Sequence, residues 1–106
     1  MVQVITQIAE DPKRLMELVG IAPEDYVYVD YIINHEAGWG GATTWNRAGS
    51  GAYGICQSLP ATKMASAGED YMTNPLTQLK WCNSYAQSRY GGWANAYRYW
   101  LSHGNW

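Results

Sequence analysis

The most unusual absence in this sequence of 106 residues is phenylalanine. The aromatic residues are nine tyrosines and six tryptophans, so each of these rings has a polar N–H or O–H group. Such rings suit sites that are partly apolar and partly hydrated. A sugar site is one example, because the C–H face of a pyranose stacks on a ring while its hydroxyls form hydrogen bonds. The alternative is that the rings fill a small core, to which we assign about half of them.

Positive charge is also scarce, and long apolar runs are missing. Seven Lys and Arg residues are scattered among nine Asp and Glu, which gives a net charge of −2. A nucleic-acid partner would require a basic patch, so we exclude that class. The apolar runs are far shorter than the roughly 20 residues that cross a bilayer, so we expect no membrane span. Glu10 and Asp11 follow the first apolar stretch without a basic leader, so we expect no signal peptide.

Only two cysteines are present, Cys56 and Cys82. They can form one disulfide if the protein is extracellular, or remain free thiols in the core. We favour free, buried thiols. Nothing in the sequence ties His35 or His103 to Cys56, which argues against a cysteine nucleophile. No group of His, Cys and acidic residues has the spacing of a zinc site, so we predict no metal and no cofactor.

Start and stop signals of helices predict one mainly α-helical domain over residues 1–106. Asp11 precedes Pro12 and Asn74 precedes Pro75, which is the pattern of an N-cap followed by proline at the first helical position. The predicted helices cover residues 2–10, 12–19, 23–37, 59–68, 75–90 and 92–103. The glycine-rich stretch 38–59 predicts loops, with a short irregular hairpin over 50–58.

One carboxylate stands out at the end of the helix predicted over 23–37. Val29, Ile32, Ile33 and Glu36 fall at positions i, i+3, i+4 and i+7, so Glu36 continues an apolar stripe. Partial burial and the negative end of the helix dipole would both raise its pKa. A general acid that works near neutral pH needs a raised pKa, and Trp39 could form an apolar wall beside it. The alternative is a glutamate at a frayed helix end that points into solvent.

Three blocks of sequence resemble a known family: YVDYIINHEAGW, then GAYGICQSLPATKMASAG, then TNPLTQLKWCNSYAQSRYGGWANAYRYW. Together they resemble the lysozyme-like transglycosylase domains of Gram-positive surface proteins and phage. The likeness is greatest to the C-terminal domain of aggregation-promoting factors and to lytic domains in phage tail tape-measure proteins. It covers residues 20–106, and residues 1–19 form an N-terminal helical extension outside it. The resemblance implies a small lysozyme-like helical fold in which the glycine-rich segment forms a glycan groove.

The resemblance also implies roles for particular residues. Glu36 matches the single catalytic acid and base of the family, at the end of its central helix. Gln57 matches the glutamine that faces the glycan, and Ser50 and Tyr53 belong to the same segment and would line the groove. Tyr97 matches the aromatic residue of the last helix that faces the catalytic glutamate.

Two positions depart from the family pattern. Ala37 stands where the family often has serine, which removes a supporting hydrogen bond. Arg98 follows Tyr97 where related enzymes often have asparagine. These departures keep a non-catalytic alternative open, namely a glycan-binding or structural domain of a phage tail or cell-surface protein.

Only two side-chain carboxylates follow Glu36, and those nearest to it on either side are poorly placed for catalysis. Asp25 and Asp30 precede it on the same helix, and Glu69 and Asp70 lie in a loop. Glycoside hydrolysis usually takes two carboxylates, so this scarcity favours a one-carboxylate lytic transglycosylase that leaves 1,6-anhydro-MurNAc ends. A lysozyme-type muramidase is the alternative. We expect peptidoglycan strands as the partner of a monomeric domain of a larger protein, located outside the cell, in the wall or in a phage tail.

Overall fold

The computed structural model describes residues 11–46 and 49–106. The helix predicted over residues 2–10 therefore lies outside the described residues. Within them the chain is mainly helical, as the sequence predicts, and its only β-type pairing is two isolated bridges. None of the helices described is long and apolar enough to cross a membrane.

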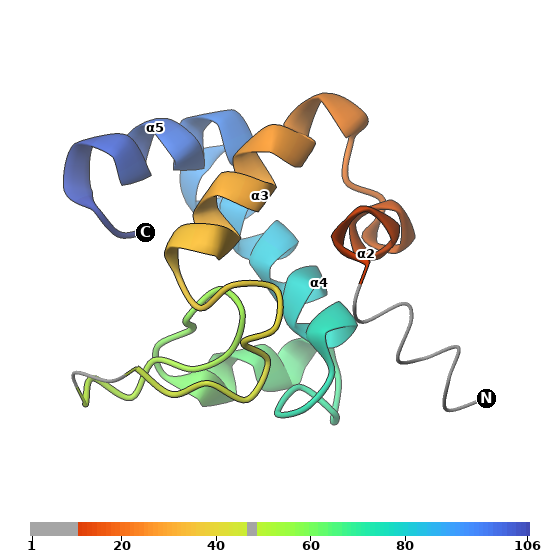
Figure 1. Cartoon of the computed structure of the whole chain (residues 1–106), viewed down its shortest axis with the longest axis vertical. Helices are drawn as coiled ribbons and strands as arrows, with labels where there is room; N and C mark the ends of the chain where they lie inside the picture. The colour runs from red at the N-terminus through yellow and green to blue at the C-terminus, as the bar shows by residue number, and fades with distance from the viewer. Residues whose placement is uncertain (1–10, 47–48) are drawn as a thin grey trace.

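Four α-helices form the framework of the described chain (Figure 1). They are α2 (Pro12–Val19), α3 (Tyr26–His35), α4 (Pro75–Tyr85) and α5 (Trp93–His103). Three short helical segments join them, the 3₁₀ turns η1 (Pro23–Asp25) and η2 (Ala61–Ala67) and the π turn η3 (Ala86–Tyr90). Helix α2 packs on α4, and α3 packs on α5. In Figure 1 the long loop between α3 and η2 lies below α3 and α5 and beside the lower end of α4.

The two predicted N-caps are confirmed, whereas the helix predicted from Pro23 begins with the 3₁₀ turn η1 and is α-helical only from Tyr26. The Asp11 side chain accepts a hydrogen bond from the Arg14 N–H at 3.3 Å, and Asn74 accepts one from the Leu76 N–H at 2.9 Å. Each cap satisfies an N–H group that has no partner inside its helix. Proline follows each cap at the first helical position.

The predicted helix ends need correction in two places. Helix α3 ends at His35, two residues before the predicted Ala37, because Gly38 takes a left-handed conformation with φ of 82° and its N–H bonds to the Ile33 carbonyl. The helix predicted over 75–90 changes to a π turn at Ala86, and the segment 59–68 forms a 3₁₀ helix. In such short segments, the spacing of apolar residues does not distinguish an α-helix from a 3₁₀ or π turn.

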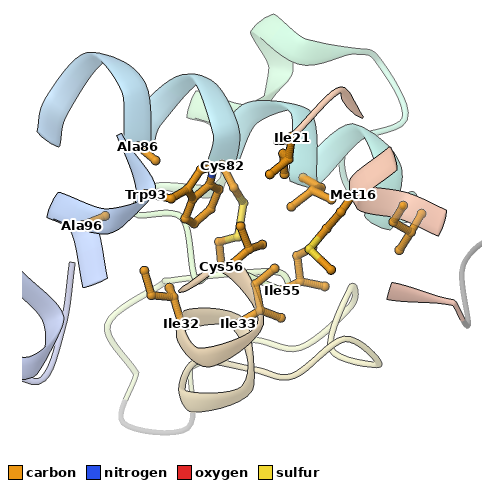
Figure 2. Close-up of a cluster of buried hydrophobic side chains, with 13 residues drawn as sticks. Met16, Ile21, Ile32, Ile33, Ile55, Cys56, Cys82, Ala86, Trp93 and Ala96 are labelled. Atoms are coloured by element: carbon orange, nitrogen blue, oxygen red, sulfur yellow. A yellow bond between two sulfur atoms is a disulfide. The ribbon is translucent and has the colours of Figure 1, made fainter. Parts of the chain in front are cut away.

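The main core lies where α2, α3, α4 and α5 meet the loop (Figure 2). Leu15 and Met16 of α2 belong to this core. Helix α2 is therefore part of the core, although the sequence resemblance covers only residues 20–106. Val29, Ile32 and Ile33 on α3 are fully buried, which confirms the predicted stripe. Ala86 is buried as well.

The preference for free thiols is wrong. Cys56 and Cys82 form a disulfide that joins the loop to α4 at the centre of the core (Figure 2). Both cysteines are buried, so the part of the prediction that placed them in the core is correct. Apolar spacing could not show that the two side chains face each other across elements 26 residues apart.

The loop between α3 and η2 is fixed to α4 by Gln78. This side chain is fully buried, and its Oε1 accepts a hydrogen bond from the Ile55 N–H at 2.9 Å. Its Nε2 donates to the carbonyl oxygens of Ala42 at 2.8 Å and Tyr71 at 2.7 Å. The hairpin predicted over 50–58 is present only as bridges that pair Tyr53 with Trp45 and with Ser58. Side-chain bonds from Gln78 therefore replace much of the pairing that a regular hairpin would have.

The aromatic rings are less buried than expected. Only Trp93 and Tyr53 are buried, Trp45 is exposed, and the other rings are half-buried. Many of the half-buried rings pack against the outside of the core. Their polar groups reach partners or solvent at that depth, which a phenylalanine ring would not need.

Candidate active site

Glu36 lies immediately after α3, at the point where the chain leaves the helix. Its N–H bonds to the Ile32 and Ile33 carbonyls, so the backbone still follows the helix while the next residues turn away. Gly41 allows the turn, since a Cβ there would lie 2.5 Å from the Ala37 carbonyl oxygen. The chain thus folds back over Ala37 and places the loop opposite Glu36.

A cavity of about 250 Å³ opens between Glu36 and this loop, and we call it the Glu36 cavity. Its lining residues come from the end of α3 and from both sides of the loop. They are Glu36, Ala37, Thr44, Trp45, Asn46 and Gln57. Among these lining residues, Glu36 is the only group that can donate and accept a proton near neutral pH.

Glu36 is held by Trp100 of α5. The indole Nε1 donates a hydrogen bond to Oε1 of Glu36 at 3.0 Å. The Trp100 ring is itself supported by α3, where it meets the edges of Tyr31 at 5.5 Å and His35 at 5.1 Å between ring centroids. Trp100 thereby keeps the carboxylate of Glu36 from rotating freely into solvent.

Burial raises the pKa of Glu36 above its usual value. The hydrogen bond from Trp100 and the charge of His35 act in the opposite direction but do not cancel the effect of burial. The net direction is the one that the sequence predicts. A larger fraction of Glu36 therefore stays protonated as the pH approaches neutrality.

Gln57 forms the opposite wall in an unusual backbone conformation. Its φ of 55° is left-handed, which is uncommon for a residue other than glycine. Its Nε2 donates to the carbonyl oxygens of Thr44 at 3.1 Å and Gly54 at 3.0 Å. These bonds hold the side chain in place, and they leave the amide oxygen as the group that can accept a hydrogen bond from a ligand.

The structure brings Glu36 and Gln57 together, but it places the other predicted groove residues elsewhere. Tyr53 is only 3% exposed, and its hydroxyl donates to the Met72 carbonyl at 2.6 Å, so it lies beneath the loop. Trp39 donates from Nε1 to Asp30 at 2.8 Å and does not line the cavity. Ser50 accepts a bond from the Ala52 N–H and also lies outside the lining.

Tyr97 does not face Glu36 in this structure. Its ring packs on α3 against Tyr28 at 5.1 Å and Tyr31 at 5.0 Å between centroids. Trp100, one turn further along α5, makes the contact with Glu36 instead. Both residues lie on α5, and the sequence alone does not show which of them reaches the carboxylate.

Trp45 is a site residue that the sequence analysis missed. Its ring is 53% exposed at the cavity and lies on Tyr53 at 4.4 Å between centroids. The signal was present in the sequence, since no apolar periodicity explains a tryptophan at this position of a polar, glycine-rich loop. The buried Tyr53 ring thus supports Trp45 from the protein interior and is not itself exposed to a ligand.

The described residues contain no group of three His, Cys, Asp or Glu side chains arranged to hold a metal ion. Asp70 is occupied elsewhere, because it accepts hydrogen bonds from Thr77 at 2.6 Å and Asn74 at 2.9 Å. These bonds lower the pKa of Asp70, so it stays ionised and is unsuited to donate a proton near neutral pH.

No family model, no curated protein and no solved structure matches the chain significantly.

Proposed function

We propose that this chain is a peptidoglycan lytic transglycosylase that cleaves the MurNAc–GlcNAc β-1,4 bond. The observation on which this depends is a single half-buried carboxyl, Glu36, with a raised pKa in a cavity that has no second carboxylate in its lining. The family-like sequence blocks agree with this chemistry. A two-carboxylate hydrolase would need a partner acid across the cavity.

In the proposed mechanism, the protonated Glu36 gives its proton to the glycosidic oxygen as the C1–O bond breaks. The resulting carboxylate then removes the proton from the C6 hydroxyl of the same muramic acid, and that oxygen bonds to C1. The products are a 1,6-anhydro-MurNAc end and a free 4-hydroxyl, and Glu36 is again protonated. No water is consumed, which accords with one carboxyl that serves as acid and then as base.

The neighbouring residues suit a glycan. Trp45 offers an exposed ring on which a pyranose face can stack, and Gln57 offers an amide oxygen for a sugar hydroxyl or N-acetyl N–H. Ala37 lines the cavity and has no hydroxyl for Glu36. The Trp100 indole is a hydrogen-bond donor at that carboxylate, so the loss of the family's serine does not leave Glu36 without support.

The Cys56–Cys82 disulfide supports an extracellular location, because such bonds persist in oxidising compartments. We therefore propose that the protein acts on walls from outside the cytoplasm. Both a cell-surface protein and a phage tail meet this condition.

The test is digestion of purified cell walls by the wild type and by Glu36→Gln. The amide can still accept the Trp100 hydrogen bond, so we expect the fold to remain and the rate of lysis to fall by about 10²–10⁴-fold. Glu69→Gln is the matched control, since Glu69 is exposed and lies outside the cavity lining, and it should lyse walls normally. Lysis by Glu36→Gln at the wild-type rate would exclude the proposed role.

Mass spectrometry of the wild-type products distinguishes the reaction classes. Anhydro ends support the transglycosylase, whereas reducing ends would assign the protein to the muramidases. Wall binding without any lysis by the wild type would identify a non-catalytic glycan-binding domain.

A further inference from the structure

A second cavity, of about 200 Å³, adjoins the Glu36 cavity on the other side of Gln57. We call it the Lys63 cavity. Gln57 lines both cavities, so the two lie next to each other, and a ligand that spans Gln57 would contact both. The walls of the Lys63 cavity include the side chains of Lys63 from η2, Trp81 and Tyr85 from α4, and Trp106.

Three aromatic rings give the Lys63 cavity a fixed shape. Trp81 and Tyr85 are stacked, with centroids 4.9 Å apart and planes 18° apart. Trp106 meets Tyr85 edge-on at 5.1 Å, and its Nε1 donates to the Cys56 carbonyl at 3.1 Å. Cys56 is in turn bonded to Cys82 on α4, so the wall is tied to the helix that bears the other two rings. The half-buried rings offer apolar faces of the kind on which a pyranose stacks.

Lys63 is the one charged side chain among the residues that line this second cavity. It is exposed, and the ion pair recorded within the described residues joins Arg14 and Glu17 instead. The carboxyl of Glu36 lies in the first cavity and the ammonium of Lys63 in the second. Together the two cavities therefore suit a strand that is uncharged at the cleaved bond and anionic a short distance along.

We infer that the Lys63 cavity binds a further sugar of the same glycan strand and that Lys63 pairs with a carboxylate carried by the lactyl arm of a muramic acid. That carboxylate is the free lactyl group on a strand without stem peptides, or a carboxylate of the stem peptide where one is attached. This inference rests on the proposed function, because it extends the same strand beyond the Glu36 cavity. The aromatic walls hold the ring, and the ammonium recognises the arm that distinguishes muramic acid from N-acetylglucosamine. The protein thereby selects peptidoglycan over chitin away from the reacting bond.

The experiment measures binding to Glu36→Gln protein, which prevents turnover. The probes are a chitin tetrasaccharide, a GlcNAc–MurNAc tetrasaccharide with free lactyl carboxylates, and the same tetrasaccharide bearing stem peptides. Adding Lys63→Glu should weaken binding of the free-acid probe about fivefold at low salt, as an exposed ion pair allows. Binding of the chitin probe should change less than about twofold, and the difference should shrink in high salt. The peptide-bearing probe shows whether a peptide carboxylate can replace the lactyl one.

Two further variants show whether an effect of Lys63→Glu is specific to the Lys63 cavity. Lys13→Glu makes the same charge change on α2, where it lines neither cavity, and should leave all affinities unchanged. Trp45→Ala should weaken binding of chitin and the muramic probes alike, because it removes a ring from the Glu36 cavity. If walls are lysed while Lys63→Glu affects both probes equally, or neither, this inference is wrong and the proposed function stands. If the wild type neither lyses walls nor binds any probe, the proposed function itself fails.

Discussion

At the scale of single residues, the important contact is between Trp100 and Glu36. A hydrogen bond to a carboxylate stabilises the charged form, so the indole lowers a pKa that burial raises. Trp100 therefore limits how far the pKa rises and also fixes the direction of the carboxyl. In the proposed mechanism Trp100 is thus a positioning residue, since it would act on the substrate only through Glu36.

Trp100→Phe keeps a ring on α5 and removes the indole N–H. The pKa of Glu36 should rise further, because the bond that favours its ionised form is lost while burial remains. In the proposed mechanism Glu36 is the proton donor and would then stay protonated to higher pH, so the basic limb of the pH profile of wall lysis should move upward. NMR titration of the Glu36 side-chain carboxyl should show the same direction of change.

Tyr97→Phe is the control for this prediction. The resemblance places Tyr97 opposite Glu36, whereas in the structure its ring contacts Tyr28 and Tyr31. We expect the basic limb of the pH profile of wall lysis to stay at the wild-type pH in this variant. A shift in Tyr97→Phe without one in Trp100→Phe would favour the residue that the resemblance suggests.

At the scale of elements, the loop that forms one side of the site depends on α4. Gln78 is fully buried on that helix and bonds three backbone groups, the Ile55 N–H and the carbonyls of Ala42 and Tyr71. Gly54 permits this approach, since a Cβ there would lie 2.7 Å from Oε1 of Gln78. The loop is thus held by side-chain bonds from a helix rather than by a sheet.

Gln78→Leu should destabilise the protein by about 3 kcal/mol or more, because three buried backbone groups lose their partner. Denaturant unfolding followed by tryptophan fluorescence measures this loss. Gln87→Leu makes the same change at an exposed position of η3 and should alter the free energy of unfolding by less than about 0.5 kcal/mol. Equal effects in the two variants would show that the Gln78 bonds do not stabilise the loop.

The same elements show how much could be predicted from the sequence. Caps, prolines and apolar spacing act over a few residues, so they predicted α2, α3, α4 and α5 and the burial of the stripe ending at Glu36. The role of Gln78 depends on residues up to 36 positions away, which no local pattern encodes. The placement of Trp45, and of Trp100 rather than Tyr97 against Glu36, likewise depends on how loop and helices meet.

At the scale of the whole molecule, a small core is surrounded by half-buried rings instead of being filled by them. Trp93 is the large aromatic residue inside the main core, and aliphatic residues and the disulfide form most of the rest (Figure 2). The absence of phenylalanine fits this arrangement, because rings at an intermediate depth need a polar group. The two cavities lie in this half-buried layer, on either side of Gln57.

The Cys56–Cys82 disulfide joins the loop to α4 inside the core, and its reduction should affect the whole molecule. The bond closes a loop between residues 26 positions apart, so the chain-entropy estimate of its contribution is about 3.5 kcal/mol. We expect dithiothreitol to lower the free energy of unfolding by about this amount. Cys56→Ala/Cys82→Ala should be as stable with the reductant as without it, which separates loss of the bond from other effects of dithiothreitol.

Because Gln57 follows Cys56 directly and lines both cavities, reduction of the disulfide should also weaken glycan binding before the protein unfolds. Glycan affinity that stays unchanged in the reduced, folded protein would show that the disulfide stabilises the core without positioning Gln57.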